Sequence, residues 1–421
     1  MLDKIKSNHI LKVIFEYLHN KKKLNIIKNN KRILNKLNEE KKNFEVYDIL
    51  SLFNKTFNVY IKDIDIKEIN LSEKYIGNEG LKYLCKLEIK QLRILNLNRN
   101  GITDIKELEN AKFKELKELN LSNNRILNIN ILEKVKFKKL EILNFYYNII
   151  EDITILEKVN FKELKVLNLG ANKIKNINIL EKVKFKKLEK LILNDEYLNS
   201  PILDIDLLEK ANFKNLKILS LTKQNISNIS FLKSVHFKKL KNLNLYFNEI
   251  SDISALEYVD FNELKYLNLN RNNISNIDVL EYVNFEKLEK LYISENKIKD
   301  INVFEKVNFQ ELKELNLSFN EILDINALTK AKFKNLKYLN LYCNKISDIE
   351  SSRKLTFKKL KFLDFSDNHL PFLKVIKEII KCEKYRNVYL YSIACEIAVC
   401  LTILLGLLLI ALLFFFLLKY G

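Results

Sequence analysis

Short segments with alternating leucines recur along most of the chain. In each one, two leucines separated by a single residue are followed by an asparagine and then by two isoleucines. Alternation with a period of two is typical of a short β-strand with one buried face. The pattern returns at a constant interval, as from Leu95 to Leu119, so we expect one structural unit that is repeated many times. One copy consists of Leu119, Leu121, Asn124, Ile126 and Ile129.

A phenylalanine column keeps the same interval in the segment between the strands. The interval is broken once, because the step from Leu191 to Leu219 is longer than all the others, which places a four-residue insertion near residues 194–203. Two interpretations of the insertion stay open: a tolerated surface loop, or a loop that contacts a partner. The phenylalanines are Phe113, Phe137, Phe161, Phe185, Phe213, Phe237, Phe261, Phe285, Phe309, Phe333 and Phe357.

The asparagine that follows each predicted strand is expected to be structural. Its amide can both donate to and accept from the backbone groups of a buried turn. Stacked units would then form a ladder of such hydrogen bonds. Glu196 and Gln224 break the column, and we expect the turn near Glu196 to form an exposed bulge. The predicted ladder consists of Asn100, Asn124, Asn148, Asn172, Asn248, Asn272, Asn296, Asn320, Asn344 and Asn368.

The repeated motif resembles that of the leucine-rich-repeat family, L-x-x-L-x-L-x-x-N-x-L. Its Ile-x-x-Ile ending is similar to the short class found in internalins and in phosphatase-regulatory repeat proteins. The units here are slightly longer and carry the additional phenylalanine. The resemblance covers residues 69–373. It implies an α/β solenoid, a curved superhelix with a parallel β-sheet on its concave face, and it leaves open that the chain is a regulatory subunit of an enzyme such as a phosphatase.

Five parts follow one another along the chain. A basic helical segment covers residues 1–43, and an N-terminal cap with an atypical first repeat covers residues 44–94. The cap is expected because terminal units must close the exposed ends of a solenoid core. Twelve leucine-rich repeats are predicted for residues 95–373. A basic juxtamembrane helix is predicted for residues 374–388, and a transmembrane tail for residues 389–421.

The N-terminal segment is strongly basic, with twelve lysine and arginine residues against four acidic ones in residues 1–43. Its apolar residues have the spacing of amphipathic helices, beginning with Ile10, Leu11, Ile14 and Leu18. The segment is similar to the F-box, a three-helix module that docks on a ubiquitin-ligase adaptor. That resemblance implies a substrate receptor for ubiquitin ligation. The alternative is a basic helical cap on the solenoid.

Residues 397–418 form an uninterrupted stretch without a charge. A helix of this length is about 33 Å long, which is enough to cross a hydrocarbon core of about 30 Å. We expect a tail-anchored, single-pass membrane protein. The positive charges before the span would place the repeats in the cytosol, and the long leucine-rich span favours the endoplasmic reticulum. Cys382, beside the span, is either an inert thiol or a palmitoylation site. The membrane-proximal basic residues are Lys381, Lys384 and Arg386.

Repeat proteins bind partners with their concave sheet. Two kinds of residue alternate with the buried leucines there: an asparagine column at Asn96, Asn120, Asn144, Asn168, Asn244, Asn268, Asn316 and Asn340, and many aromatic residues. Exposed aromatic side chains among uncharged polar ones are typical of protein-recognition surfaces. We therefore predict a protein or peptide ligand at Tyr146, Tyr147, Tyr246, Phe247, Tyr266, Tyr292, Phe319, Tyr338, Tyr342 and Phe362.

Charge and motif content narrow the function further. The net charge is +19, but the charges on the predicted concave face are few and of both signs, whereas a nucleic-acid groove needs lysine and arginine to neutralise phosphates. The four histidines form no pair, and no phosphate-binding loop or metal-binding motif appears. We expect a non-enzymatic protein with no nucleic-acid partner, metal or cofactor. The concave charges are Glu118, Lys190, Asp195, Arg271, Lys290, Glu295 and Glu314.

Overall fold

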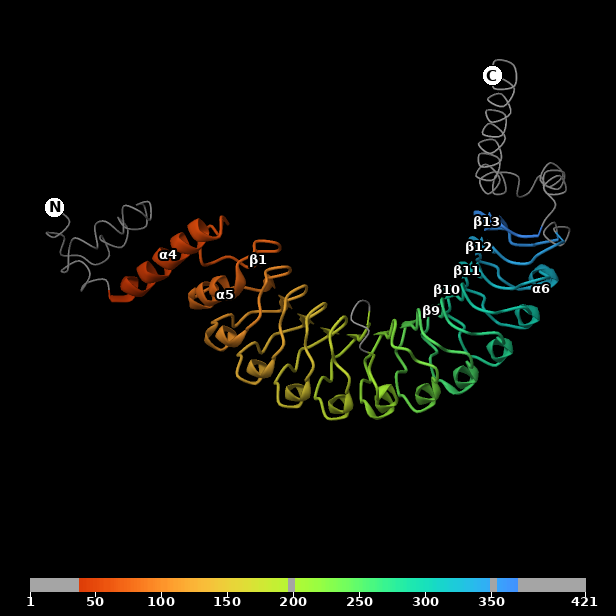
Figure 1. The fold of residues 1–421 in the computed structure, drawn as a ribbon, viewed down its shortest axis with the longest axis horizontal. Coiled ribbons are helices and arrows are strands. Elements are labelled where there is room, and N and C mark those ends of the chain that lie inside the picture. The colour runs from red at the N-terminus through yellow and green to blue at the C-terminus, as the bar shows by residue number, and fades with distance from the viewer. Residues whose placement is uncertain (1–37, 196–200, 349–353, 370–421) are drawn as a thin grey trace, which may run out of the picture. The chain divides into compact units, whose positions relative to one another are not determined.

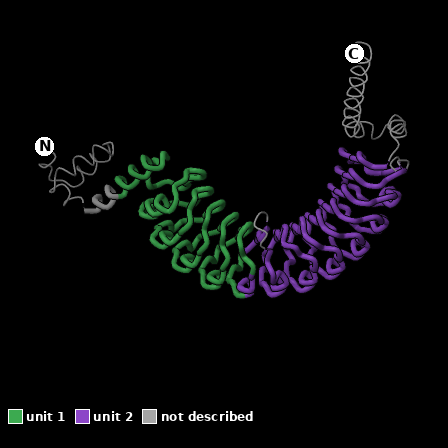
Figure 2. The backbone as a smooth tube through the Cα atoms, in the orientation of Figure 1, with its two compact units in different colours: residues 1–175, 182–187 green, residues 176–181, 188–421 purple. Residues whose placement is uncertain are grey.

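The structure is a computed structural model that describes residues 38–195, 201–348 and 354–369. It divides into two compact units, unit 1 with residues 1–175 and 182–187, and unit 2 with residues 176–181 and 188–421 (Figure 2). Each unit is a curved solenoid in which strands line one side and short helices the other (Figure 1). The predicted solenoid with a parallel sheet is therefore confirmed.

The described part of unit 1 starts with a helix and continues with regular repeats. Each repeat pairs a three-residue strand with a short return helix, labelled α for an α-helix and η for a 3₁₀-helix. Its elements are α4 (Asn38–Thr56), β1 (Glu68–Asn70), α5 (Gly77–Lys86), β2 (Ile94–Asn96), η2 (Lys106–Asn110), β3 (Glu118–Asn120), η3 (Asn130–Glu133), β4 (Ile142–Asn144), η4 (Thr154–Glu157) and β5 (Val166–Asn168).

Unit 2 continues the same alternation of strand and return helix. Its elements are η5 (Asn178–Glu181), β6 (Lys190–Ile192), η6 (Ile205–Lys210), β7 (Ile218–Ser220), η7 (Ser230–Lys233), β8 (Asn242–Asn244), η8 (Ser254–Tyr258), β9 (Tyr266–Asn268), η9 (Asp278–Glu281), β10 (Lys290–Tyr292), η10 (Asn302–Glu305), β11 (Glu314–Asn316), α6 (Asn326–Lys330), β12 (Tyr338–Asn340) and β13 (Phe362–Asp364).

Consecutive strands within each unit pair in parallel and in register. In unit 1 this holds from β1 to β5, and in unit 2 from β6 to β13. The middle residue of a strand always pairs with the middle residue of the next, as Leu291 does with Leu267 and Leu315. These middle residues are buried, and the residues on either side of them are mostly half-buried. The repeat length therefore fixes which side chains face outward on the sheet.

The phenylalanine column lies inside the core, beneath the return segments. None of its eleven members is more than 3% exposed. Rings of neighbouring repeats approach one another: Phe113 and Phe137 have centroids 6.3 Å apart, and Phe333 and Phe357 are 5.9 Å apart. The long return segment of these repeats is thus anchored by a ring that fills the space behind the sheet.

A second column of acidic and amide side chains starts the return helices. In the regular repeats Oδ1 accepts a hydrogen bond from the N–H two residues later, as Asp252 does from Ser254 at 2.7 Å. This local bond fixes the turn that leads into the helix. Asp204, in the repeat with the insertion, instead accepts from the N–H of Ile177 at 3.0 Å. The regular cases are Asp104, Asn128, Asp152, Asn176, Asn228, Asp252, Asn276, Asp300 and Asp324.

The N-terminal end of unit 1 differs from the expected division. Helix α4 is continuous across position 43, where we placed the end of the basic segment. Its Phe53 is buried, and the Asn54 amide donates to the carbonyl of Ile61 at 2.8 Å while accepting from the Ile61 N–H at 3.0 Å. This amide pins the loop that leads into the sheet. In the first repeat α5 replaces the 3₁₀-helix, and Gly77 enters it with φ +57°.

Several predictions fall outside the described residues. These are the F-box-like helices up to residue 37, the bulge at Glu196, and everything from residue 370 onward, including the juxtamembrane helix and the span at 397–418. Among the helices that are described, none combines the length and the apolar composition needed for a membrane span. The predicted localisation at a membrane stays a prediction.

Lysine and glutamate side chains pair between neighbouring repeats at the entrance to the strands. Glu289 accepts hydrogen bonds from Lys265 at 2.7 Å and from Lys313 at 2.5 Å, and these two bonds lower its pKa to about 2. Glu141 lies in the same way between Lys117 and Lys165, and its pKa is also lowered to about 2. Part of the basic excess is thus held in bridges along one edge of the sheet.

The lowered pKa values predict an acid-sensitive contribution to stability. A carboxylate whose pKa is lower in the folded state stabilises that state at pH values above its unfolded pKa, and this stabilisation is lost as the pH falls through the folded value. Between about pH 5 and pH 2 the wild type should therefore lose more stability than Glu289→Gln. The difference should be about 1 kcal/mol or less, because these bridges are exposed to solvent. Urea unfolding at several pH values measures it, and parallel curves would contradict the prediction.

Candidate protein-binding face

The concave face of each unit presents the residues that flank the buried leucines. The ten predicted binding residues all lie there, and none of them is buried. Tyr147, Phe247 and Phe319 are the most exposed, at 40%, 42% and 47%. The others are half-buried. Tyr146 and Tyr147 belong to unit 1, and the other eight residues belong to unit 2.

Several of these aromatic residues are already arranged in pairs. The rings of Tyr338 and Phe362 stack with centroids 4.3 Å apart, and Phe319 meets Tyr342 edge-on at 5.0 Å. Tyr266 meets Tyr292 edge-on at 5.4 Å. Such pairs hold each ring in place before a ligand arrives, which lowers the entropy lost on binding.

One column of the face has a left-handed backbone. The residue just before each ladder asparagine has φ between +51° and +56° in unit 2, and this column includes Phe247, Arg271, Glu295 and Phe319. Glycine favours this conformation, but the repeats place large side chains there. The left-handed turn therefore carries exposed side chains such as Phe247 and Phe319 on the concave face.

The asparagine column of the strands has a structural function that we did not predict. Each Oδ1 accepts the N–H two residues later, as Asn244 does from Tyr246 at 3.1 Å and Asn340 from Tyr342 at 2.9 Å. The motif N-x-polar directly after a strand could have indicated this turn. Asn268 is also buried, not exposed as expected. The column therefore fixes the turn that follows each strand. Because Oδ1 faces the backbone N–H, the amide nitrogen points away from that N–H.

The charged residues of the face are mostly engaged with one another. Glu314 accepts hydrogen bonds from Lys290 and from the hydroxyl of Tyr292. Burial opposes ionisation of Glu314, but these two bonds outweigh it and lower its pKa, while burial and this carboxylate raise the pKa of Tyr292. Asp195, which we expected to be exposed, is only 4% exposed, and its N–H donates to the carbonyl of Thr222. Glu118 and Lys190 are half-buried beside their strands.

The predicted asparagine ladder is visible as a set of hydrogen bonds. The Asn272 side chain accepts from the N–H of Ile250 at 3.0 Å and donates to the carbonyls of Leu245 at 3.0 Å and Leu269 at 2.9 Å. Asn248 and Asn296 repeat this arrangement one unit before and one unit after. Each amide thus connects two consecutive turns.

Gln224 does not break the ladder, contrary to our expectation. Its Oε1 accepts from the N–H of Ile202 at 2.8 Å, and its Nε2 donates to the carbonyl of Leu193. Leu193 lies 31 residues before Gln224, whereas the corresponding partner of Asn272 lies 27 residues before it. The additional residues are the insertion, and the longer glutamine reaches across it.

Gln224→Asn is therefore expected to destabilise unit 2 by about 1–3 kcal/mol, because the shorter amide cannot keep both bonds and leaves a buried group unpaired. Urea unfolding followed by circular dichroism measures the change. The matched control is Gln310→Asn on an exposed return segment, which should change stability by less than about 0.5 kcal/mol. Equal effects of the two variants would contradict the proposed reach of Gln224.

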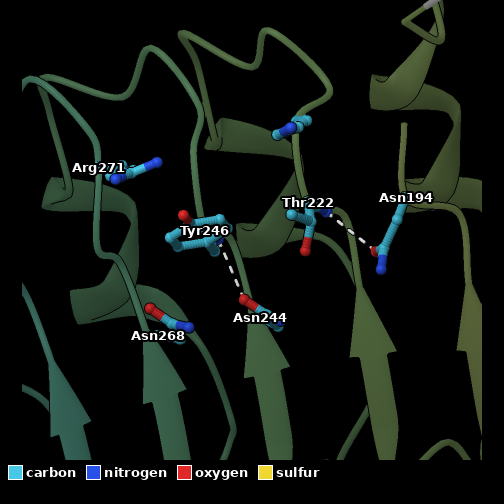
Figure 3. Close-up of a pocket in the computed structure, with 7 residues that line it drawn as sticks. Asn194, Thr222, Asn244, Tyr246, Asn268 and Arg271 are labelled. Atoms are coloured by element: carbon cyan, nitrogen blue, oxygen red, sulfur yellow. Dashed lines mark hydrogen bonds between the residues drawn. The ribbon is translucent and has the colours of Figure 1, made fainter. Parts of the chain in front are cut away.

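A hollow of about 490 Å³ lies on the concave face of unit 2, at the ends of β6 to β9. Figure 3 shows Arg271 beside Tyr246, with Asn268 and Asn244 below them and Thr222 next to Asn194. We call it the cationic hollow, because its lining includes two cations and, among the described residues, no carboxylate. The described residues that line it are Asn194, Thr222, Lys223, Asn244, Tyr246, Asn268 and Arg271.

Thr222 is the unusual member of this lining. Its N–H donates to Oδ1 of Asn194 at 3.1 Å and its carbonyl accepts from Asp195, but its hydroxyl is buried and has no hydrogen-bond partner in the described part of the chain. Among the described residues it is the only buried side-chain polar atom without one. A buried hydroxyl without a partner costs about 1–3 kcal/mol. Its position marks the cationic hollow as a functional candidate.

The described residues contain no cluster of three or more histidine, cysteine, aspartate or glutamate side chains that could hold a metal ion. Cys85 is buried, which raises the pKa of its thiol, and the described Cys343 is half-buried and is far from Cys85 in the sequence. The concave face offers aromatic rings, amides and a few cations. That chemistry suits recognition of another molecule.

Comparison with known proteins identifies the repeats. Residues 90–134, 262–306, 286–330 and 310–354 match the family model of leucine-rich repeats in two copies. A comparison with curated protein sequences gives no match. The matched regions contain copies of the strand motif and part of the ladder, such as Asn124 and Asn272.

Solved structures of leucine-rich-repeat proteins share the fold. An internalin, InlF of Listeria monocytogenes, is 24% identical, with a TM-score of 0.55 over 76% of this chain and 94% of that chain. A leucine-rich-repeat protein of Leptospira interrogans is 22% identical, with a TM-score of 0.53 over 76% and 95%. The functional domain of InlJ of Listeria monocytogenes is 18% identical, with a TM-score of 0.53 over 76% and 64%. The chain therefore contains leucine-rich repeats, and its fold is that of the internalin-type leucine-rich-repeat proteins.

Proposed function

We propose that the chain is a non-enzymatic recruitment module that binds a protein with its concave face and is tethered to a membrane. The observation that carries the proposal is the row of aromatic side chains on that face. Monomeric proteins seldom expose large apolar side chains in a contiguous group unless these form a contact site. Phe247 and Phe319, both more than 40% exposed, are expected to be anchors in the interface.

The membrane part of the proposal rests on the sequence. The uncharged residues 397–418 are long enough to span a bilayer, and Lys381, Lys384 and Arg386 precede them. Tethering confines the repeats to a surface, which raises the effective concentration of a partner that is already there. The tether therefore increases occupancy of the concave face without any additional contact.

Proximity labelling from the repeats in living cells tests the binding function. The concave variant Phe247→Asn with Phe319→Asn removes two rings and keeps a residue that accepts a left-handed backbone, as Asn123 does with φ +53°. The control is Tyr258→Asn with Tyr282→Asn, which removes two exposed rings from the return segments. We expect the concave variant to lose specific labelled proteins and the control to retain them. Identical labelling in both variants would contradict the function.

The topology has its own test. Protease treatment of intact vesicles should digest the repeats, because the proposal places them on the cytosolic side. Alkaline extraction should leave the full chain in the membrane fraction and release a variant that lacks residues 397–418. Repeats shielded from protease, or release of the full chain, would refute the tethering part of the proposal.

A further inference from the structure

We propose that the cationic hollow binds a carboxylate side chain in an extended, acidic segment of the partner protein. The inference rests on the proposed function and specifies its ligand: a glutamate- or aspartate-bearing segment that crosses the ends of β6 to β9. Lys223 and Arg271 would hold the carboxylate, and Asn244 and Thr222 would donate to neighbouring acceptors of the segment.

The two cations both lie close to one aromatic ring. Lys223 Nζ is 5.1 Å from the centroid of the Phe247 ring, and the guanidinium carbon of Arg271 is 5.7 Å from the same centroid. The three residues come from consecutive repeats, so the sheet register places one cation in the repeat before Phe247 and the other in the repeat after it. No carboxylate is among the described residues that line the hollow. An anion placed between Lys223 and Arg271 is attracted by both side chains.

Arg271 is oriented for such an anion. Its Nε donates to Oε2 of Glu295 at 2.6 Å, and the guanidinium carbon lies 5.7 Å from the centroid of the Tyr246 ring. A guanidinium has five N–H donors in one plane, so the bond from Nε to Glu295 fixes the plane and leaves donors on the terminal nitrogens. The terminal nitrogens form the fork that recognises carboxylates in two parallel bonds.

The neighbouring polar groups supply donors. Oδ1 of Asn244 accepts from the N–H of Tyr246 at 3.1 Å, which turns the amide nitrogen toward the hollow, where it makes no hydrogen bond within the described part of the chain. The Thr222 hydroxyl also has no partner there, and a rotation about χ1 redirects it. Both groups match the carbonyl oxygens of an extended backbone.

The dimensions also suit a peptide. A volume of about 490 Å³ lies within the range of about 300–1,000 Å³ that ligand sites have. Four adjacent strands span roughly 14 Å at about 4.8 Å per step, which an extended chain of about four or five residues covers. A segment of this length reaches from Asn194, at β6, to Arg271, at β9.

Fluorescence anisotropy with the purified full chain in detergent tests the inference. The probe is a labelled peptide of six residues with four consecutive glutamates and an amidated C-terminus, and the reference peptide has glutamine at those four positions. We expect the glutamate peptide to bind at least tenfold more tightly. Lys223→Gln and Arg271→Gln should each weaken its binding about tenfold, whereas Arg271→Lys should weaken it less. Equal affinity for the two peptides would overturn the inference.

The chain has a net charge of +19, so a control must separate the cationic hollow from general attraction. Lys214→Gln with Lys334→Gln removes the same charge as the double variant Lys223→Gln with Arg271→Gln, but from exposed return segments. The control should bind the glutamate peptide as the wild type does. Equal losses of affinity in the two double variants would overturn the inference. It would also be overturned if a single-stranded RNA hexamer, or a glutamine peptide with a free C-terminal carboxylate, bound more tightly than the glutamate peptide.

Thr222→Val tests whether the Thr222 hydroxyl serves binding and not stability, because the two functions predict opposite changes in the thermal midpoint. Removing the buried hydroxyl without a partner should raise the thermal midpoint of unfolding and weaken binding of the glutamate peptide about threefold or more. A lower midpoint with unchanged binding would contradict the proposed function of the hydroxyl. If the glutamate peptide fails to bind but Phe247→Asn with Phe319→Asn still removes labelled proteins in cells, the ligand assignment fails while the binding function stands.

Discussion

Phe333→Ala is expected to lower the free energy of unfolding by about 3–5 kcal/mol, the typical cost of removing a buried aromatic side chain. Phe333 is 2% exposed and lies between Phe304, with centroids 5.7 Å apart, and Phe357, at 5.9 Å. The variant leaves a cavity and removes two ring contacts, each of which contributes about 0.5–1.5 kcal/mol. Urea unfolding of the full chain in detergent, followed by far-ultraviolet circular dichroism, measures the loss.

The control for this variant is Tyr282→Ala. Tyr282 is 63% exposed on a return segment, so its removal should change stability by less than about 0.5 kcal/mol. Phe333→Leu should lie between the two, because leucine fills part of the space. If Phe333→Ala were as stable as Tyr282→Ala, the phenylalanine column would not be the anchor of the return segments.

Asn272→Ala is expected to cost about 3 kcal/mol, the upper end of the range for a buried backbone donor that is left unpaired. The change removes the acceptor of the buried N–H of Ile250 and weakens the donation to the carbonyls of Leu245 and Leu269. Each of these carbonyls keeps a second donor from a neighbouring ladder asparagine, so the unpaired N–H dominates the cost. Chemical unfolding measures the effect, and hydrogen exchange at Ile250 localises it.

Two further variants separate hydrogen bonding from packing at this position. Asn272→Asp keeps the shape and the acceptor but cannot donate and buries a charge, so it should destabilise at pH 7 and recover part of the loss on acidification. Asn273→Ala, at the half-buried neighbouring residue, is the control and should be nearly neutral. A mild effect of Asn272→Ala together with a large effect of Asn273→Ala would refute the ladder as a source of stability.

Much of the fold followed from periodicity. Because the first leucine of the motif returns at a constant interval, the strand register and the buried position of residues such as Leu267 and Leu291 could be predicted. The same constant interval made the phenylalanine column recognisable in the sequence. A repeat that stacks on its own copy leaves few alternatives, since every unit must bury the same face.

Other features could not be read from the same pattern. The reach of Gln224 depends on the path of the backbone around the insertion, and the sequence alone indicates only that the period is broken there. The burial of Asp195 and the paired state of Glu314 depend on side chains of neighbouring repeats, which lie a full repeat away in sequence. The hydrogen bonds of the strand asparagines, in contrast, are local. Each joins the asparagine Oδ1 to the N–H two residues later, a turn that asparagine commonly forms, so the sequence could have predicted them.

The cationic hollow combines both kinds of information. Lys223, Phe247 and Arg271 share one column of the repeat, so their adjacency follows from the period. The unpaired hydroxyl of Thr222 and the fixed plane of Arg271 appear only in three dimensions. Sequence periodicity therefore predicted the face, and the structure locates the part of it with the most specific chemistry.

Site-specific photo-crosslinking from the concave face tests the proposed binding function most directly. A photoreactive benzoylphenylalanine is introduced in cells at position 247 or 319 on the concave face, and at position 258 or 282 on the return segments, in otherwise unchanged full-length chains. We predict that the two concave positions crosslink to the same partner protein and that the two return positions do not. Crosslinks to that protein from the return positions, or none from either concave position, would contradict binding by the concave face.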